Sequence, residues 1–130
     1  MLTVKAGDKS PIKTASASVS SSSAVSEKIV WEEGVDKHHV LEGSRGGHIE
    51  GWNKMGFNPK DKNTWNLLLP IMQYVVDNYD SVESKIVDGG NRVMYYTKEF
   101  AEVGVTVVVK IWVSVDGLIQ KLSDAWPIIN

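Results

Sequence analysis

Cysteine does not occur in the 130-residue chain, which excludes disulfide bonds and thiolate metal ligands. The chain also lacks the run of about 18 apolar residues that a membrane helix needs. Its longest candidate, residues 103–115, is interrupted by Gly104, Thr106, Lys110 and Ser114. The N-terminus has no continuous apolar core after its first lysine, so it does not resemble a signal peptide. If the protein is exported, we expect its export signal on a larger parent chain or on a partner.

A strong excess of charge of one sign is missing as well, because the formal net charge is only -2. This balance argues against an extensive phosphate-tracking surface but leaves room for a compact RNase with a local basic patch. Hydrophobic residues make up 42% of the chain and charged residues 23%, which are ordinary values for a globular protein. The length suits one domain with a real core.

The first part of the chain differs in composition from the rest. Residues 16–26 are mostly Ser, Ala and Val, with an unbroken serine run at 20–23. Such a segment buries too little apolar surface to offset its ordering entropy. We therefore expect a flexible Ser-rich linker or leader over residues 1–28 and one folded domain over residues 29–130.

Helical spacing is clearest between Trp65 and Tyr79, where apolar residues recur every three or four positions. Pro70 lies within this pattern and either kinks the helix or marks its first turn. A short helix is expected to open near Trp31 and to end near Val40. Residues 44–47 and 51–61 are predicted to be loops, since glycine, asparagine and proline punctuate them.

Strand patterns follow the helical part of the chain. Residues 85–88 and 92–97 flank a Gly-Gly-Asn turn, residues 103–115 are rich in β-branched side chains, and residues 118–126 follow an Asp-Gly turn. The order predicts an α+β domain with N-terminal helices packed on a twisted antiparallel sheet of about four strands.

The three histidines, His38, His39 and His48, lie within eleven residues of each other. Histidine is the side chain that titrates near neutral pH, so two imidazoles can act as base and acid. In metal-free RNA cleavage the base removes the proton of the ribose 2′-OH and the acid protonates the 5′-oxygen. The product is a 2′,3′-cyclic phosphate. The alternative is that one or two of these histidines are ordinary surface residues.

A metal site is a further alternative for the histidines. Their spacing lacks the helical i, i+4 pair of a zinc-binding HExxH motif, and adjacent histidines on a strand would point to opposite faces. Without cysteine, the remaining ligands would have to come from Asp36, Glu42 or Glu50. We therefore expect no metal and no other cofactor.

Three segments together resemble the bacterial EndoU family of RNase toxins. KHHVLEG at 37–43, followed by GGH at 46–48, is similar to that family's K-H-(I/V)-L-x-G and G-G-H pattern. The helix beginning at Trp65 and the terminal hairpin with SDAWP at 123–127 follow in the family's order. The resemblance spans residue 37 to the C-terminus and implies a fold of the barnase/EndoU/colicin/RelE-like class.

The resemblance also implies roles for individual residues. His39 matches the family's first catalytic histidine and His48 its second, which leaves His38 as an extra residue. The family has threonine and an aromatic where this chain has Asp124 and Trp126. A carboxylate would repel phosphate, so Ser123 is the candidate for the third catalytic group. Because a one-residue shift turns a strand side chain to the other face, this role for Ser123 requires a bulge.

Several other side chains are candidates for binding the RNA substrate. Arg45 and Lys54 lie in loops near the histidines and suit a phosphate, while Thr97 or Lys98 is expected to face the cleft. Trp126 and Trp52 are candidates for stacking on bases. Tryptophan is more often a core residue, and Trp65 and Trp112 are assigned to the core; the charged candidates have the alternative of being ordinary solvated residues.

These expectations combine into one leading function. The resemblance implies a monomeric toxin endoribonuclease, aimed at tRNA, delivered as part of a larger secreted or cell-surface protein into the cytoplasm of a competing cell. Proteins of this kind are neutralised by a cognate immunity protein. One alternative is a non-enzymatic binding module, such as an immunity or antitoxin protein, which the mild acidity would suit. The other alternative is a metal-dependent nuclease.

Overall fold

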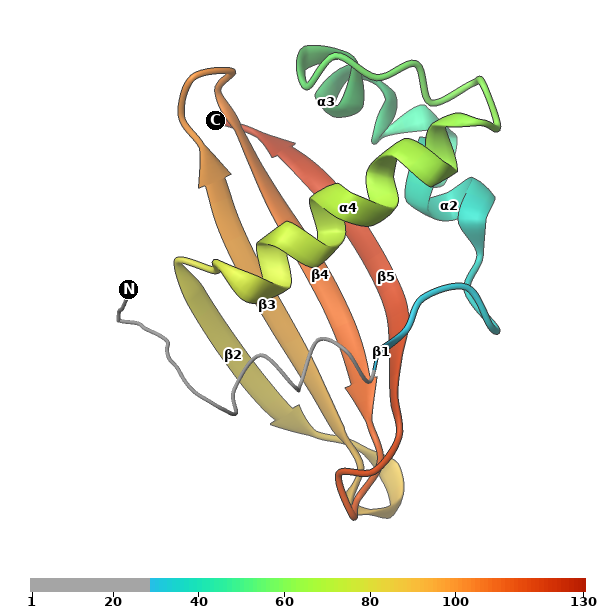
Figure 1. Ribbon diagram of the computed structural model, residues 1–130, viewed down its shortest axis with the longest axis vertical. Helices are drawn as coiled ribbons and strands as arrows, with labels where there is room; N and C mark the ends of the chain where they lie inside the picture. Colours follow the sequence, from blue (N-terminus) through green and yellow to red (C-terminus); the bar gives the residue numbers. More distant parts are fainter. Residues whose placement is uncertain (1–28) are drawn as a thin grey trace.

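The computed structural model describes residues 29–130; the predicted linker at 1–28 lies outside the described residues. The α-helices are α2 (Lys37–Glu42), α3 (Ile49–Lys54) and α4 (Thr64–Asp77), with 3-10 turns η1 (Ser44–Gly46) and η2 (Asp88–Gly90). The strands are β1 (Ile29–Val30), β2 (Ser81–Ile86), β3 (Arg92–Phe100), β4 (Val105–Val113) and β5 (Gln120–Ile129). The helices precede the long strands, so the α+β class is confirmed (Figure 1).

The strands form one twisted sheet in the order β1-β5-β4-β3-β2. Strands β2 to β5 pair antiparallel, whereas β1 runs parallel to β5, with Ile29 opposite Gln120. The expectation of about four antiparallel strands was therefore wrong in one respect: the sheet has five strands and is mixed. Two residues are too few to show the alternation that identifies a strand, so only its pairing with β5 defines β1.

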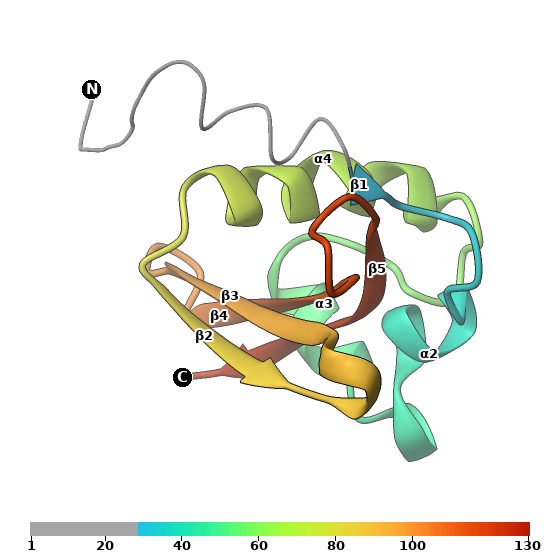
Figure 2. The same cartoon turned by 90° about the horizontal axis from the view of Figure 1, so that it is seen from below.

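Helix α4 covers one face of the sheet, and α2 and α3 gather at the β5 edge (Figure 2). The buried side of α4 carries Trp65, Leu68, Met72 and Val75, as its helical spacing predicted. Pro70 lies inside the helix, so it does not mark the first turn; the carbonyl of residue 66 loses its helical donor there. No helix within residues 29–130 is long and apolar enough to cross a membrane.

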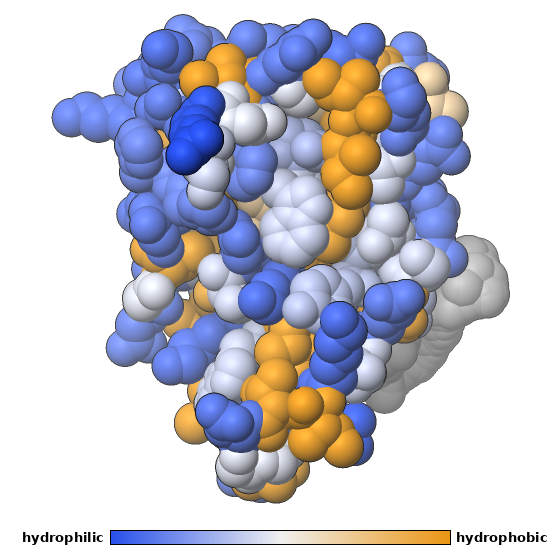
Figure 3. Space-filling view, turned by 180° about the vertical axis from the view of Figure 1, so that it is seen from behind, coloured by the Kyte–Doolittle hydropathy of each residue, from blue (hydrophilic) through white to orange (hydrophobic). Residues whose placement is uncertain are grey.

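The two faces of the sheet differ in chemistry. Val107 and Val109 are fully buried in the core shared with α4. Side chains alternate along a strand, so Val108 and Lys110 point to the opposite side, which we call the open face. The cross-strand register adds Tyr95, Asp124 and Trp126, among others, to this face. Figure 3 shows it: side chains of intermediate hydropathy lie at its centre, beside a strip of apolar atoms.

Helix α3 replaces part of the loop that was expected at residues 51–61. The loop prediction relied on Gly56, Asn58 and Pro59 as turn residues, and Gly51 at its start lowers helix propensity. The structure gives a different reason for that glycine: a Cβ there would lie 2.6 Å from Cγ of Pro127 on β5. Glycine at this position therefore lets α3 pack directly against the C-terminal strand, and the adjacent Trp52 is fully buried.

Two hairpin ends meet at the end of the sheet remote from α3 (Figure 1). The predicted Asp116-Gly117 turn is confirmed, with Gly117 at φ 77°. The Ser114 hydroxyl and the Leu118 N–H both donate to Asp116, and these hydrogen bonds lower the pKa of its carboxyl group. A hydrogen bond joins this turn to the neighbouring β2–β3 turn: the N–H of Val115 donates to Asn91 Oδ1 at 2.9 Å.

Adjacent leucines on α4 test which face of the helix stabilises the fold. Leu68 is fully buried, whereas Leu67 is 56% exposed. We expect Leu68→Ala to lower the free energy of unfolding by about 2–5 kcal/mol, because it removes buried methyl groups and leaves a cavity. Leu67→Ala is the matched control and should change it by about 0.5 kcal/mol or less. Equal losses in urea unfolding experiments would contradict this packing.

Candidate functional site

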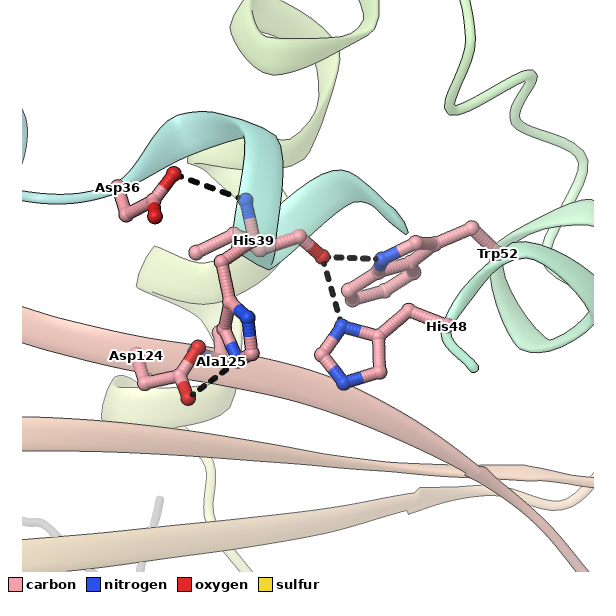
Figure 4. A network of polar contacts seen from close by, with 7 residues as sticks. Asp36, His39, His48, Trp52, Asp124 and Ala125 are labelled. Carbon is pink, nitrogen blue, oxygen red and sulfur yellow. Dashed lines mark hydrogen bonds and ion pairs between the residues drawn. The ribbon is translucent and has the colours of Figure 1, made fainter. Parts of the chain in front are cut away.

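His39 is placed by helix α2, which begins later than expected, at Lys37 rather than near Trp31. Asp36 caps the helix, accepting a hydrogen bond from the backbone N–H of His39 at 3.0 Å. The His39 side chain turns toward β5, where its Nε2 lies 3.3 Å from Oδ2 of Asp124 (Figure 4). The two side chains are 38% and 24% exposed, so this contact is partly shielded but accessible.

His48 is held by a backbone carbonyl at the end of the same helix. Its Nδ1 lies 3.1 Å from the oxygen of Val40, which also accepts from the indole N–H of Trp52 at 2.8 Å. A carbonyl oxygen can only accept, so Nδ1 of His48 carries a proton. In the neutral ring Nε2 is then the basic nitrogen, free of that contact (Figure 4).

The two imidazole rings lie side by side. Their centroids are 5.4 Å apart and their planes meet at 73°. Nε2 of His39 donates to the carboxylate of Asp124, which leaves Nδ1 as the nitrogen of that ring available for proton transfer. Both rings keep one nitrogen available, each ring oriented by a different partner. This pairing can take a proton from one oxygen of a small group and give a proton to another.

Asp124, and not Ser123, makes the contact with His39. The pairing of β4 with β5 shifts register here: Lys110 lies opposite Asp124 and Ile111 opposite Leu122. The extra residue, Ser123, forms the bulge that its predicted role required, and it is exposed. The bulge also keeps the carboxylate of Asp124 out of the core, between the buried Leu122 and Ala125. The negative charge expected to be unfavourable for phosphate is thus engaged by a histidine.

Two predicted phosphate ligands flank His48 along the chain. Arg45 is exposed in η1, with the positive backbone φ of 55° that places it in a tight turn. Lys54 is exposed at the far end of α3, and its Nζ lies 3.9 Å from where a Cβ on Gly104 would be. Arg45 therefore stays close to the histidines in sequence, while Lys54 reaches toward the β3–β4 turn.

The predicted pair Thr97 and Lys98 is divided between the two faces of the sheet. Lys98 lies opposite Val107, on the side of α4, and its Nζ is 3.1 Å from Asp80 Oδ1. Consecutive strand residues point to opposite faces, so only one of the two could face the cleft, and Lys98 does not share the face of Asp124. Thr97 lies opposite Val108 and so belongs to the open face.

The predictions for two of the tryptophans also required correction. Trp52 is fully buried and its indole N–H is bound to Val40, so it is not available to stack on a base. Trp112, which was assigned to the core, is half-buried on the open face beneath the ammonium of Lys121, 5.4 Å from the ring centroid. Trp65 is buried as expected. Trp126 lies half-buried on the open face, two residues after Asp124.

The sequence prediction missed part of the polar surface beside the histidines. Lys85 and Lys110 both hold their ammonium groups over the ring of Tyr95, at 5.3 and 5.8 Å. They lie on different strands, so no local motif joins them. The available signal was alternation within β4, where Lys110 interrupts a run of valines.

Tyr96 is an ionisable residue that lies away from the two histidines, on the core face of the sheet. Burial and the nearby Tyr79 raise the pKa of Tyr96 to about 12, so its phenol stays protonated on the core face. Within residues 29–130, no group of three or more histidine, aspartate and glutamate side chains is arranged to hold a metal ion.

Gly43 tests how closely the site is packed. Its φ is 73° and its ψ is -176°, and a Cβ there would lie 2.6 Å from the His48 ring. We expect Gly43→Ala to displace that ring and to cost about 1–3 kcal/mol in backbone strain alone. Gly34→Ala is the matched control, since Gly34 has φ 77° but open space around it.

The measurements are urea unfolding and the imidazole resonances of His48. Gly43→Ala should lower stability more than Gly34→Ala and should move the His48 signals, which the control leaves in place. Unchanged His48 resonances in a folded Gly43→Ala variant would contradict the packing described.

Comparison with known proteins returned no relatives: no family model, no curated protein and no solved structure matches this chain.

Proposed function

We propose that this protein is an endoribonuclease that cleaves RNA without a metal, using the 2′-OH of the substrate as nucleophile. One observation carries the proposal. His39 and His48 lie 5.4 Å apart, and each has one ring nitrogen occupied by a fixed acceptor. Two oriented imidazoles on one accessible surface are what a base and an acid acting on the same phosphodiester require.

The contacts suggest which histidine does what. Val40 holds the proton on Nδ1 of His48, so its Nε2 is free to accept the proton of the 2′-OH. The 2′-oxygen then attacks phosphorus and the bond to the 5′-oxygen breaks. His39 pairs with Asp124 when protonated and gives its proton to the departing 5′-oxygen. The products are a 2′,3′-cyclic phosphate and a 5′-hydroxyl, and the two histidines end with exchanged protonation states.

The biological setting of the proposal comes from the EndoU resemblance. The α+β fold, with helices before the long strands, is compatible with it, and the segments that carry it meet at one site. His39 from the KHHVLEG segment lies beside His48 from the GGH segment and Asp124 from SDAWP. We therefore propose a barnase/EndoU-like toxin, directed at tRNA in a competing cell and neutralised by a cognate immunity protein.

Replacing each histidine in turn tests the assignment. His39→Ala and His48→Ala should each reduce RNA cleavage by about a hundredfold or more, since each removes one proton-transfer group. His38→Ala is the matched control, because the side chain of His38 is 78% exposed and, within residues 29–130, its ion pair is with Glu42 in the same helix. Cleavage of total bacterial RNA is measured in EDTA, and fragment ends are analysed for 2′,3′-cyclic phosphate.

Persistent activity in both variants, or activity that disappears in EDTA, would refute the two-histidine mechanism. The second result would point to a metal-dependent nuclease. Intact RNA with all proteins, under conditions where the chain is folded, would favour a binding role.

Asp124 is expected to act as a positioning residue for His39. Asp124→Asn keeps the size of the side chain but removes the charge that pairs with the imidazolium. We expect a fall in kcat of about ten- to hundredfold with little change in KM, because the ring loses its orienting partner. Asp77→Asn, at an exposed carboxylate on α4, is the control.

A second readout separates positioning from general damage. In ¹⁵N spectra of the wild type, neutral His39 should carry its proton on Nε2 and neutral His48 on Nδ1. Asp124→Asn should alter the His39 signals and leave those of His48 unchanged. A His39 proton on Nδ1 in the wild type would exclude the role given to Asp124.

A further inference from the structure

The open face of the sheet carries a group of lysines laid over aromatic rings. Lys85 and Lys110 approach Tyr95 from two strands, and the ring of Tyr95 meets that of Trp126 at 6.5 Å and 67°. The four residues come from β2, β3, β4 and β5, so the group crosses the whole width of the antiparallel sheet. Tyr95, Lys110 and Trp126 are half-buried and Lys85 is exposed.

This group adjoins the histidine site through strand register. Tyr95 lies opposite Lys110, and Lys110 lies opposite Asp124, the partner of His39. Directly opposed strand residues have Cβ atoms about 4.5–5.5 Å apart. Trp126 follows Asp124 on the same face at a rise of about 7 Å for two residues. The lysine–aromatic surface is therefore directly adjacent to the proposed cleavage site.

A second pair extends the same surface along the sheet. Lys121 lies opposite Trp112 and places its ammonium 5.4 Å from that ring. Trp112 is two residues after Lys110 and faces the same way. Aromatic and cationic groups therefore alternate from the histidine site toward the hairpin ends.

The local charge differs from that of the whole chain. Three lysines, Lys85, Lys110 and Lys121, share the open face with the carboxylates of Glu83, Glu99 and Asp124. Asp124 lies against His39 and Glu99 accepts a hydrogen bond from Asn130, whereas all three ammonium groups lie over aromatic rings. The open face therefore balances three lysines against three carboxylates, and its ammonium groups are concentrated over Tyr95 and Trp112.

We propose that this surface binds single-stranded RNA, with bases stacking on Tyr95 and Trp126 and phosphates held by Lys85, Lys110 and Lys121. Every base has a face that can stack on an aromatic ring, and a lysine ammonium can move from a ring to a phosphate with little loss. Bases inside a duplex are already stacked and cannot lie on a sheet, so the substrate is unpaired. The inference rests on the proposed function for the position of the scissile bond.

Binding can be measured without cleavage by using a fluorescein-labelled oligonucleotide with 2′-O-methyl riboses, which cannot be cut through the 2′-oxygen. Fluorescence anisotropy then gives Kd as a function of salt. We expect Lys85→Ala combined with Lys110→Ala to weaken binding by at least tenfold and to reduce the salt slope by about 1–2, because two phosphate contacts are lost. Lys60→Ala, at an exposed lysine in the loop between α3 and α4, is the matched control.

The stacking part is tested at Trp126. Trp126→Ala should weaken binding by about tenfold, and Trp126→Phe should restore most of it, because a ring remains. Tyr95→Ala should behave like Trp126→Ala. Urea unfolding verifies that each variant is folded, and the Phe variant preserves the test if the Ala variant is not.

Three outcomes would overturn the RNA-binding surface. The oligonucleotide could fail to bind, could bind equally well to the lysine and tryptophan variants, or could bind no better than a duplex of the same sequence. If the variants bind normally while His39→Ala and His48→Ala abolish cleavage, only the binding surface is refuted and the proposed function stands. If binding follows the prediction but no RNA is cut, the proposed function is refuted and the RNA-binding surface stands.

Discussion

The candidate site depends on the two hydrogen bonds that the backbone carbonyl of Val40 accepts, from His48 and from Trp52. Val40 is 1% exposed and lies near the end of α2, where backbone oxygens have no helical donor. A buried carbonyl without a partner is costly, and here two donors from the next segment of chain, Trp52 and His48, satisfy it. The same contact joins α2 to α3 and fixes the His48 ring. One oxygen atom therefore both joins the two helices and orients the ring of a candidate catalytic residue.

Strand β5 supplies the other half of the site through an irregularity. In a regular strand, Asp124 would share a face with the buried Leu122. The bulge at Ser123 turns Asp124 to the opposite side, where it meets His39. Pro127, three residues later, packs where Gly51 leaves room for it, and this holds α3 against the strand. The site is assembled from small local departures from regular structure, each enforced by packing.

The acidity of the chain and the proposed RNA substrate are reconciled by where the charges lie. Most of the carboxylates within residues 29–130 lie in loops and turns, whereas the lysines of the open face lie over tyrosine and tryptophan rings. Screening limits the reach of charges to about 8 Å at physiological salt, so the local arrangement matters more than the total.

Periodicity and turn chemistry were enough to predict the α+β class, helix α4 and the hairpin turns, and the EndoU resemblance singled out His39 and His48 as the candidate pair. The packing of the folded chain was needed to show that residues 29–30 form a strand, that residues 49–54 are helical and that Trp52 is buried while Trp112 is not. It also selected Asp124 over Ser123 and placed Lys98 on the face of α4. The reason is physical: which way a side chain points in a bulged or edge strand depends on what packs against that strand, and no neighbouring residue in the chain carries that information.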